Sequence, residues 1–196
     1  MSWIPETYEA PASLSGDYLK IRAGETHKIR ILGEFKHPKT AIMGWLGWKE
    51  EMGERHPIRC EYKSEGFDEC AKNSTDKPRH FWALIIWLCD VKRIAVWEIT
   101  QKTIQDAIVT LSNNPDWGNP TKYNLSVSRK GESLPDTVYT VVPAPPIAPA
   151  PDEAKQAARD ADIDLQKLFT GENPFGKVPE TLPRSGEEIH DDIPFQ

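Results

Sequence analysis

Alternation of apolar and polar side chains predicts several β-strands in the first 142 residues. Residues 26–35 alternate charged and isoleucine side chains, which is the period of a half-buried strand with one charged face. Residues 80–88 and 93–99 are rich in Trp, Ile, Leu and Val, and only four residues separate them. That spacing is typical of an antiparallel hairpin.

One amphipathic helix is predicted after this hairpin. From Ile104 the apolar residues recur at i, i+3, i+4 and i+7, so residues 103–113 should form a helix with Thr100 as its N-cap. Alternation returns at residues 122–128, and residues 137–142 predict a last strand. The order of three strands, a helix and two strands is that of an OB-fold five-stranded barrel, so we expect an all-β domain with one helix over residues 1–147.

A long insertion follows the first predicted strand, at about residues 36–79. It is much longer than ordinary connections and is therefore expected to carry a function of its own. Residues 41–48 form a candidate extra strand, in which Trp45 and Trp48 would face opposite sides.

The composition changes at the C-terminal end. Five prolines among residues 143–151 predict an extended, semi-rigid linker. Residues 152–196 have too little apolar surface to offset the entropy of ordering, so we expect residues 148–196 to be a linker followed by a disordered acidic tail. A short helix near residues 153–169 is the alternative, because four apolar residues there have helical spacing.

The net charge is concentrated in this tail. Residues 1–150 carry 19 basic and 19 acidic residues, whereas residues 151–196 carry 5 and 11, so the formal charge of −6 belongs to the tail. An acidic whole chain is therefore compatible with a nucleic-acid partner for the first domain.

Cysteine usage and hydropathy indicate a reducing, cytoplasmic setting. Three cysteines form no even disulfide framework, and no secretion signal or membrane-length apolar run is present. Cys60 and Cys70, with His56 and His80 nearby, raise the alternative of a zinc site. However, nine residues between the thiols exceed the usual short spacing, so buried or free thiols are the simpler interpretation and no metal or cofactor is expected.

Aromatic and basic residues interleave along the predicted strands. A protein that binds a single strand needs cations that follow the phosphates and flat rings for the bases. On the strand 93–99, Arg93, Ala95 and Trp97 should share one face, so Trp97 is expected to be an exposed stacking ring, whereas one of Trp82 and Trp87 should point inward. The candidate DNA-binding residues are Lys20, Arg22, Lys28, Arg30, Trp45, Trp48, Arg59, Tyr62, Lys63, Arg79, Trp82, Trp87, Lys92, Arg93, Trp97, Tyr123, Arg129 and Lys130.

Catalytic motifs do not emerge from the sequence. It has no phosphate-binding glycine-rich loop, no Gly-x-Ser-x-Gly elbow and no His-Glu-x-x-His helix, so we do not expect an enzyme. The carboxylates at residues 50–54 are better explained as a solvated face than as a metal site.

The end of the chain carries a specific resemblance. Asp191, Asp192, Ile193, Pro194 and Phe195 place carboxylates before an apolar hook, and this resembles the tail of bacterial single-stranded DNA-binding proteins. In that family the final Phe carries the free carboxylate, whereas Gln196 follows it here. The resemblance implies that the tail recruits replication or repair proteins and competes with DNA.

The domain is more similar to phage-encoded OB-fold single-stranded DNA-binding proteins, over roughly residues 17–147. Residues 81–111, with the run Trp-Glu-Ile-Thr-Gln-Lys-Thr-Ile, then residues 117–120 and Tyr123, carry this resemblance. It implies a protein that coats and protects single-stranded DNA in replication, recombination or repair, in the host cytoplasm, with self-association on DNA as a further expectation.

Two other functions remain open at this point. A protein–protein interaction adaptor would use the insertion and tail and bind no nucleic acid. An annealing or nuclease accessory enzyme is the weaker alternative.

Overall fold

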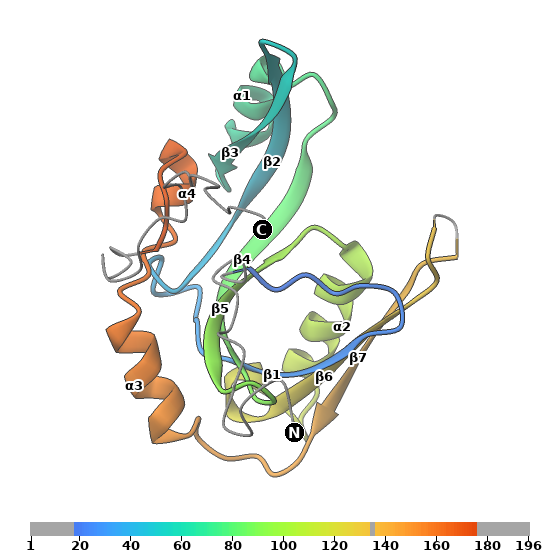
Figure 1. Ribbon diagram of the computed structural model, residues 1–196, viewed down its shortest axis with the longest axis vertical. Coiled ribbons are helices and arrows are strands. Elements are labelled where there is room, and N and C mark those ends of the chain that lie inside the picture. Colours follow the sequence, from blue (N-terminus) through green and yellow to red (C-terminus); the bar gives the residue numbers. More distant parts are fainter. Residues whose placement is uncertain (1–17, 134–135, 176–196) are drawn as a thin grey trace, which may run out of the picture.

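The computed structural model describes residues 18–133 and 136–175, and this part of the chain folds mainly into strands (Figure 1). The strands are β1 (Thr26–Ile31), β2 (Ala41–Glu51), β3 (Glu54–Glu61), β4 (Arg79–Leu88), β5 (Arg93–Ile99), β6 (Asn124–Lys130) and β7 (Val138–Ala144). The helices are α1 (Gly66–Asn73), α2 (Lys102–Asn113), α3 (Asp152–Asp160) and α4 (Lys167–Thr170), with a 3₁₀ turn, η1, at Pro120–Lys122. The mainly β class is confirmed, but the described residues contain four α-helices where one was predicted.

The strands form one antiparallel sheet centred on β4. One edge of β4 pairs with β5, and the other edge pairs first with β2 and then with β1. β1 continues the sheet to β6 and β7. In the described residues no pairing joins β5 to β7, and α2 contacts both strands. The sheet is therefore open, and the predicted closure into a barrel is not seen.

The predicted hairpin and helix are confirmed, with small shifts at their ends. β4 and β5 pair in antiparallel register, with Leu88 opposite Arg93. The N-cap of α2 is Gln101 instead of Thr100, and no side chain caps the helix. β1 ends at Ile31, earlier than predicted, and the chain turns over residues 35–40. This turn brings Thr40 so close to Gly33 that a Cβ added to Gly33 would lie 2.0 Å from the carbonyl oxygen of Thr40.

Residues 44–79 form a projection that we call the arm, drawn at the top of Figure 1. The predicted strand in the insertion is confirmed as β2, and it continues through a two-residue turn into β3. Met52 and Gly53 both have positive φ in this turn, as the tightest hairpin turns require. α1 then packs against β2 and β3.

Two apolar cores lie on opposite faces of β4. Trp82, Leu84 and Ile86 enter the first core, together with α2, β1 and β6. The alternate residues, Phe81 and Ile85 among them, enter a second core. This second core is completed from the C-terminal segment, by Ile163, Leu165 and Leu168.

The C-terminal segment is therefore folded as far as it is described. α3 packs against β5 and α4 against β3, and Leu165 is fully buried. Figure 1 shows the two helices running along one side of the molecule. The expectation of disorder is wrong for residues 152–175, because Ile163, Leu165 and Leu168 of this segment are buried in the second core. The alternative of one short helix near residues 153–169 is confirmed in part, since two helices, α3 and α4, form there. Residues 176–196 lie outside the described part. No helix in the described ranges is long and apolar enough to span a bilayer.

Candidate nucleic-acid interface

Four predicted stacking rings are buried. Trp97 is 2% exposed, Trp87 5%, Trp82 8% and Tyr123 0%. The expectation that Trp97 faces outward is wrong, because Trp97 packs in the first core while its neighbour Val96 packs in the second. Both faces of β5 are covered, so alternation along the strand leaves no exposed face.

Arg30 is a buried structural residue and not an accessible cation. It is 4% exposed, and burial lowers the pKa of its guanidinium. Its Nε donates to Asn124 Oδ1 at 2.7 Å, and its Nη1 donates to the carbonyl oxygens of Ala148 at 2.8 Å and Thr121 at 3.3 Å. The predicted DNA contact is therefore wrong, because the side chain is used to hold the proline-rich segment against β1 and β6.

Three other predicted cations already have acidic partners. Arg59 makes two bonds to Glu98, at 2.8 and 3.0 Å, and both side chains are largely buried. Lys63 pairs with Glu69 at 3.3 Å and Lys92 with Glu153 at 3.5 Å, both on the surface. Surface pairs of this kind are weak and remain open to exchange. Arg59 is the one of the three that is fixed in place.

The remaining predicted cations fall into two separate groups. One group lies around β1 and β6, where Arg129 Nη1 donates to the carbonyl oxygen of Ile21 at 3.5 Å and packs 5.9 Å from the Tyr139 ring. Lys20, Arg22, Lys28 and Lys130 are exposed, and Arg93 is half-buried. Arg79, the first residue of β4, forms the second group by itself at the end of the arm, and Figure 1 shows the arm at the opposite end of the molecule from β1 and β6. The single groove expected from the sequence is therefore not formed.

A row of aromatic rings runs from the loop after β1 across β4 and β2 to the residue that follows β3. Ring centroids are 5.4 Å apart for Phe35 and Trp82, 6.4 Å for Trp82 and His80, 5.4 Å for His80 and Trp45, and 5.9 Å for Trp45 and Tyr62. Phe35 and Tyr62, at the two ends, are 42% and 58% exposed. We call these five residues the aromatic row. Its end rings can accept a stacked base, and its inner rings support them.

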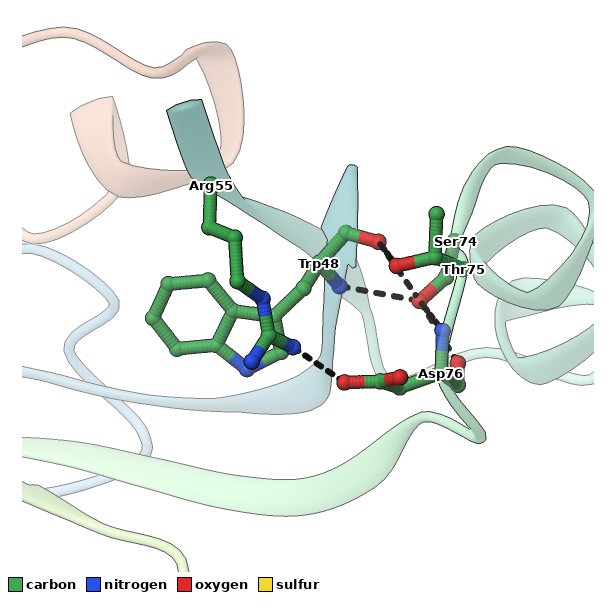
Figure 2. Close-up of polar contacts among 5 residues, drawn as sticks. All are labelled: Trp48, Arg55, Ser74, Thr75 and Asp76. Carbon is green, nitrogen blue, oxygen red and sulfur yellow. Dashed lines mark hydrogen bonds and ion pairs between the residues drawn. The ribbon is translucent and has the colours of Figure 1, made fainter. Parts of the chain in front are cut away.

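Trp48 lies on the opposite face of β2, as the alternation predicts. The Arg55 guanidinium lies over its ring, 5.2 Å from the centroid, and also pairs with Asp76 (Figure 2). The backbone N–H of Trp48 donates to Ser74 Oγ at 2.9 Å, and Thr75 Oγ1 donates to the Trp48 carbonyl at 2.9 Å. These bonds hold the segment 74–76 against the end of β2.

A cleft of about 790 Å³ opens beside this ring, and we call it the arm cleft. Three of its lining side chains are cationic, namely Arg55, Lys77 and Arg79. Asp76 is its one acidic lining residue and is already paired with Arg55. Lys77 and Arg79 are exposed and have no acidic partner in the described part of the chain. The arm cleft thus combines one held indole ring with two uncompensated positive charges.

The thiols of the insertion do not form a metal centre. Burial, followed by the neighbouring Cys70, raises the pKa of Cys60 to about 12. The Sγ of Cys70 donates to the carbonyl oxygens of Trp45 at 3.5 Å and Ile58 at 3.8 Å. Within residues 18–133 and 136–175 no group of three or more His, Cys, Asp or Glu side chains could hold a metal ion. The zinc alternative is therefore not supported.

Sequence reasoning missed several contributors to these surfaces, among them Phe35, Arg55 and His80. Arg55 directly follows the glutamate-rich residues 50–54 and was not separated from their solvated acidic face. The turn at Met52 and Gly53 folds its side chain back over Trp48. His80 belongs to the aromatic row because it lies directly opposite Trp45 in the β2–β4 register. The alternation along β2 indicated which face Trp45 and Trp48 each occupy. The neighbours of these rings could not be predicted, because the partner strand β3 was not predicted.

The predicted partner-binding residues Asp191, Asp192, Ile193, Pro194 and Phe195 lie outside the described residues. No family model matches the chain, and the search of curated proteins finds no matching relative.

Proposed function

We propose that this protein binds single-stranded DNA, coating and protecting it during phage DNA replication, recombination or repair in the host cytoplasm. The observation that carries the proposal is the arm cleft, where the Trp48 ring lies beside two cations without acidic partners. Bases stack on indole rings and on guanidinium planes, and phosphates pair with Lys and Arg. The proposed activity is binding and not catalysis.

The chemistry of the arm favours a single strand over a duplex. A duplex offers phosphates but keeps its base faces stacked inside, so it can use Lys77 and Arg79 but not the rings. A single strand can use both. Stacking contributes about 1–3 kcal/mol per base, which is enough to separate the two ligands by one or two orders of magnitude in affinity.

The strand order supports the same proposal. β1, β4, β5, β6 and β7 are connected in the order of an OB-fold, with α2 at the place where that fold has its helix. We therefore interpret the domain as an OB-fold that is open between β5 and β7. The acidic tail, as its resemblance implies, would recruit replication or repair proteins and compete with DNA for the cations.

A salt series of binding tests the proposal directly. We expect wild-type protein to bind a labelled fifteen-residue oligothymidine, dT15, more tightly than a duplex of equal length, with quenching of tryptophan fluorescence. The slope of log K against log salt should be about −0.7 per neutralised phosphate. Arg79→Glu should weaken binding and make the slope shallower by about that amount.

Lys102→Glu is the matched control. Lys102 is exposed at the start of α2, lines no part of the arm cleft and pairs with Asp106 at 2.7 Å. The loss of this surface pair is offset in part because a carboxylate there suits the helix dipole. Equal binding by Arg79→Glu and Lys102→Glu would reject the arm cleft as the site. Absence of any binding to dT15 would reject the function and favour the adaptor.

A further inference from the structure

A second concave surface lies at the Phe35 end of the aromatic row, between the loop after β1, α2 and η1. Two adjoining cavities, of about 650 and 580 Å³, share Ile31, Glu34 and Thr121 as lining residues. We call these two cavities together the side groove. The arm cleft and the side groove have no lining residue in common.

The larger half of the side groove has the character of a base pocket. Phe35 and Trp82, the last two rings of the aromatic row, line it. Ser112 and Asn119 are also among its lining residues. Asn119 Oδ1 already accepts bonds from the N–H and the hydroxyl of Thr121, both at 3.0 Å, so its amide N–H groups are left as donors. An apolar pocket with a few directed polar groups suits a flat heterocycle that carries carbonyl oxygens.

The smaller half of the side groove is lined mainly by apolar residues and by two cations, Lys122 and Lys155, and Lys36 lines the larger half. Lys155 already pairs with Asp152 at 2.9 Å. Glu34, the one acidic lining residue, pairs with Lys36. Lys122 is exposed and has no acidic partner in residues 18–133 and 136–175. A phosphate therefore finds an available charge next to the base pocket.

The loop that walls the side groove is held in place. Gly33 N–H donates to the carbonyl oxygen of Ile85 at 3.2 Å, and Glu34 N–H donates to Thr40 Oγ1 at 3.3 Å. Thr40 N–H in turn donates to the carbonyl of His37 at 2.8 Å. A wall fixed by its own bonds requires little reordering when a ligand enters.

We propose that the side groove holds one nucleotide of the bound single strand, with its base between Phe35 and Asn119 and its phosphate beside Lys122. This inference rests on the proposed function and adds a specific position to it. The aromatic row reaches the side groove at Phe35, and its other end, Tyr62, lies in the arm on the face of β2 opposite the arm cleft.

Two groove variants and their controls test the inference by fluorescence anisotropy with labelled dT15. Val109 is 46% exposed on α2 and lines the base pocket, so Val109→Trp should fill it and weaken binding about tenfold, the loss of one stacked base. Lys122→Glu should weaken binding and make the salt slope shallower by about 0.7. Val91→Trp, at a 63% exposed turn position that lines none of the cavities described above, and Lys102→Glu should bind as wild type does.

Photocrosslinking gives a readout that does not depend on affinity. A dT15 with one 5-iodouracil should crosslink to Phe35 or Trp82, as located by peptide mass spectrometry, and the crosslink should disappear in Val109→Trp. If circular dichroism shows that Val109→Trp does not fold, the affinity of Lys122→Glu and the crosslink in wild-type protein test the inference instead. Groove variants that bind like their controls, or crosslinks confined to the arm, would overturn this inference alone. Failure of wild-type protein to bind dT15 would remove the proposed function as well.

Discussion

Arg30 Nη1 donates a hydrogen bond to the carbonyl oxygen of Ala148 at 2.8 Å, across 118 positions of the chain. The same guanidinium holds Asn124 and Thr121, so one buried side chain joins β1, η1, β6 and the segment that leads to α3. Arg30→Met should leave three acceptors without their donor and lower the free energy of unfolding by about 2–4 kcal/mol. Urea unfolding followed by circular dichroism measures the loss, and Lys28→Met, an exposed change on the same strand, should cost little.

Trp97 should matter for stability and not for DNA contact. Trp97→Ala removes a ring that is 2% exposed in the first core and should lower the free energy of unfolding by about 3–5 kcal/mol. Trp97→Phe should cost less and leave affinity for dT15 unchanged, because the ring is inaccessible to a base. A selective loss of dT15 affinity in a stably folded Trp97→Phe protein would contradict this assignment.

The Cys60 thiol should make stability depend on alkaline pH. Its pKa is raised from an ordinary value of 9.0 to about 12, so the unfolded chain loses this proton at lower pH than the native protein does. The contribution of the protonated thiol to the free energy of unfolding is therefore fully present below about pH 9 and decreases as the pH rises toward 12. Urea unfolding of wild-type protein and Cys60→Ala at pH 7 and pH 10 should show their difference shrinking at the higher pH. A constant difference would mean that the thiol is not shielded in the native state.

Folding should depend on residues 152–175 but not on the residues after them. Leu165 is fully buried in the second core, and Leu165→Ala should lower the free energy of unfolding by about 2–5 kcal/mol. Deletion of residues 152–196 should uncover Phe81 and Ile85 and cause aggregation. Deletion of residues 177–196 should preserve the thermal transition. If the tail competes for cations as proposed, this shorter deletion should also raise duplex affinity in the anisotropy assay.

Ser74 should set the geometry of the arm cleft. Its Oγ accepts from the Trp48 N–H at 2.9 Å and from the Asp76 N–H at 3.2 Å, so Ser74→Ala leaves two backbone donors without their acceptor. We expect a stability loss of about 1–3 kcal/mol and weaker dT15 binding, because Asp76 then no longer fixes Arg55 over Trp48. Ser64→Ala, an exposed change elsewhere in the arm, should affect neither thermal unfolding nor anisotropy.

The elements predicted from the sequence are those whose signal is local. α2 and the β4–β5 hairpin follow from the periodicity of their own residues, which is why both were found. β3 was missed because its residues, with Pro57 and four charged side chains, show no alternation and become a strand only by pairing with β2. Its pairing also moves Arg55 over Trp48, so the arm cleft could not be read from the sequence.

The burial of Trp97 was also hidden from local reasoning. A strand is read as one-sided when its two faces differ in polarity, but β5 is covered on both sides. The second cover comes from residues 163–168, some 70 positions downstream, in a segment whose composition resembled a disordered tail. Placement of the rings thus depended on long-range packing.

The late position of that cover affects how the protein is made. When β4 and β5 have been synthesised, the apolar outer face formed by Phe81, Ile85 and Val96 still lacks the cover that Ile163, Leu165 and Leu168 provide. At roughly 5–20 residues per second, the ribosome needs several more seconds to deliver Leu165 and Leu168. During that interval the nascent chain exposes an apolar surface that can aggregate. Chaperone binding and the rate of translation should therefore govern the yield of folded protein.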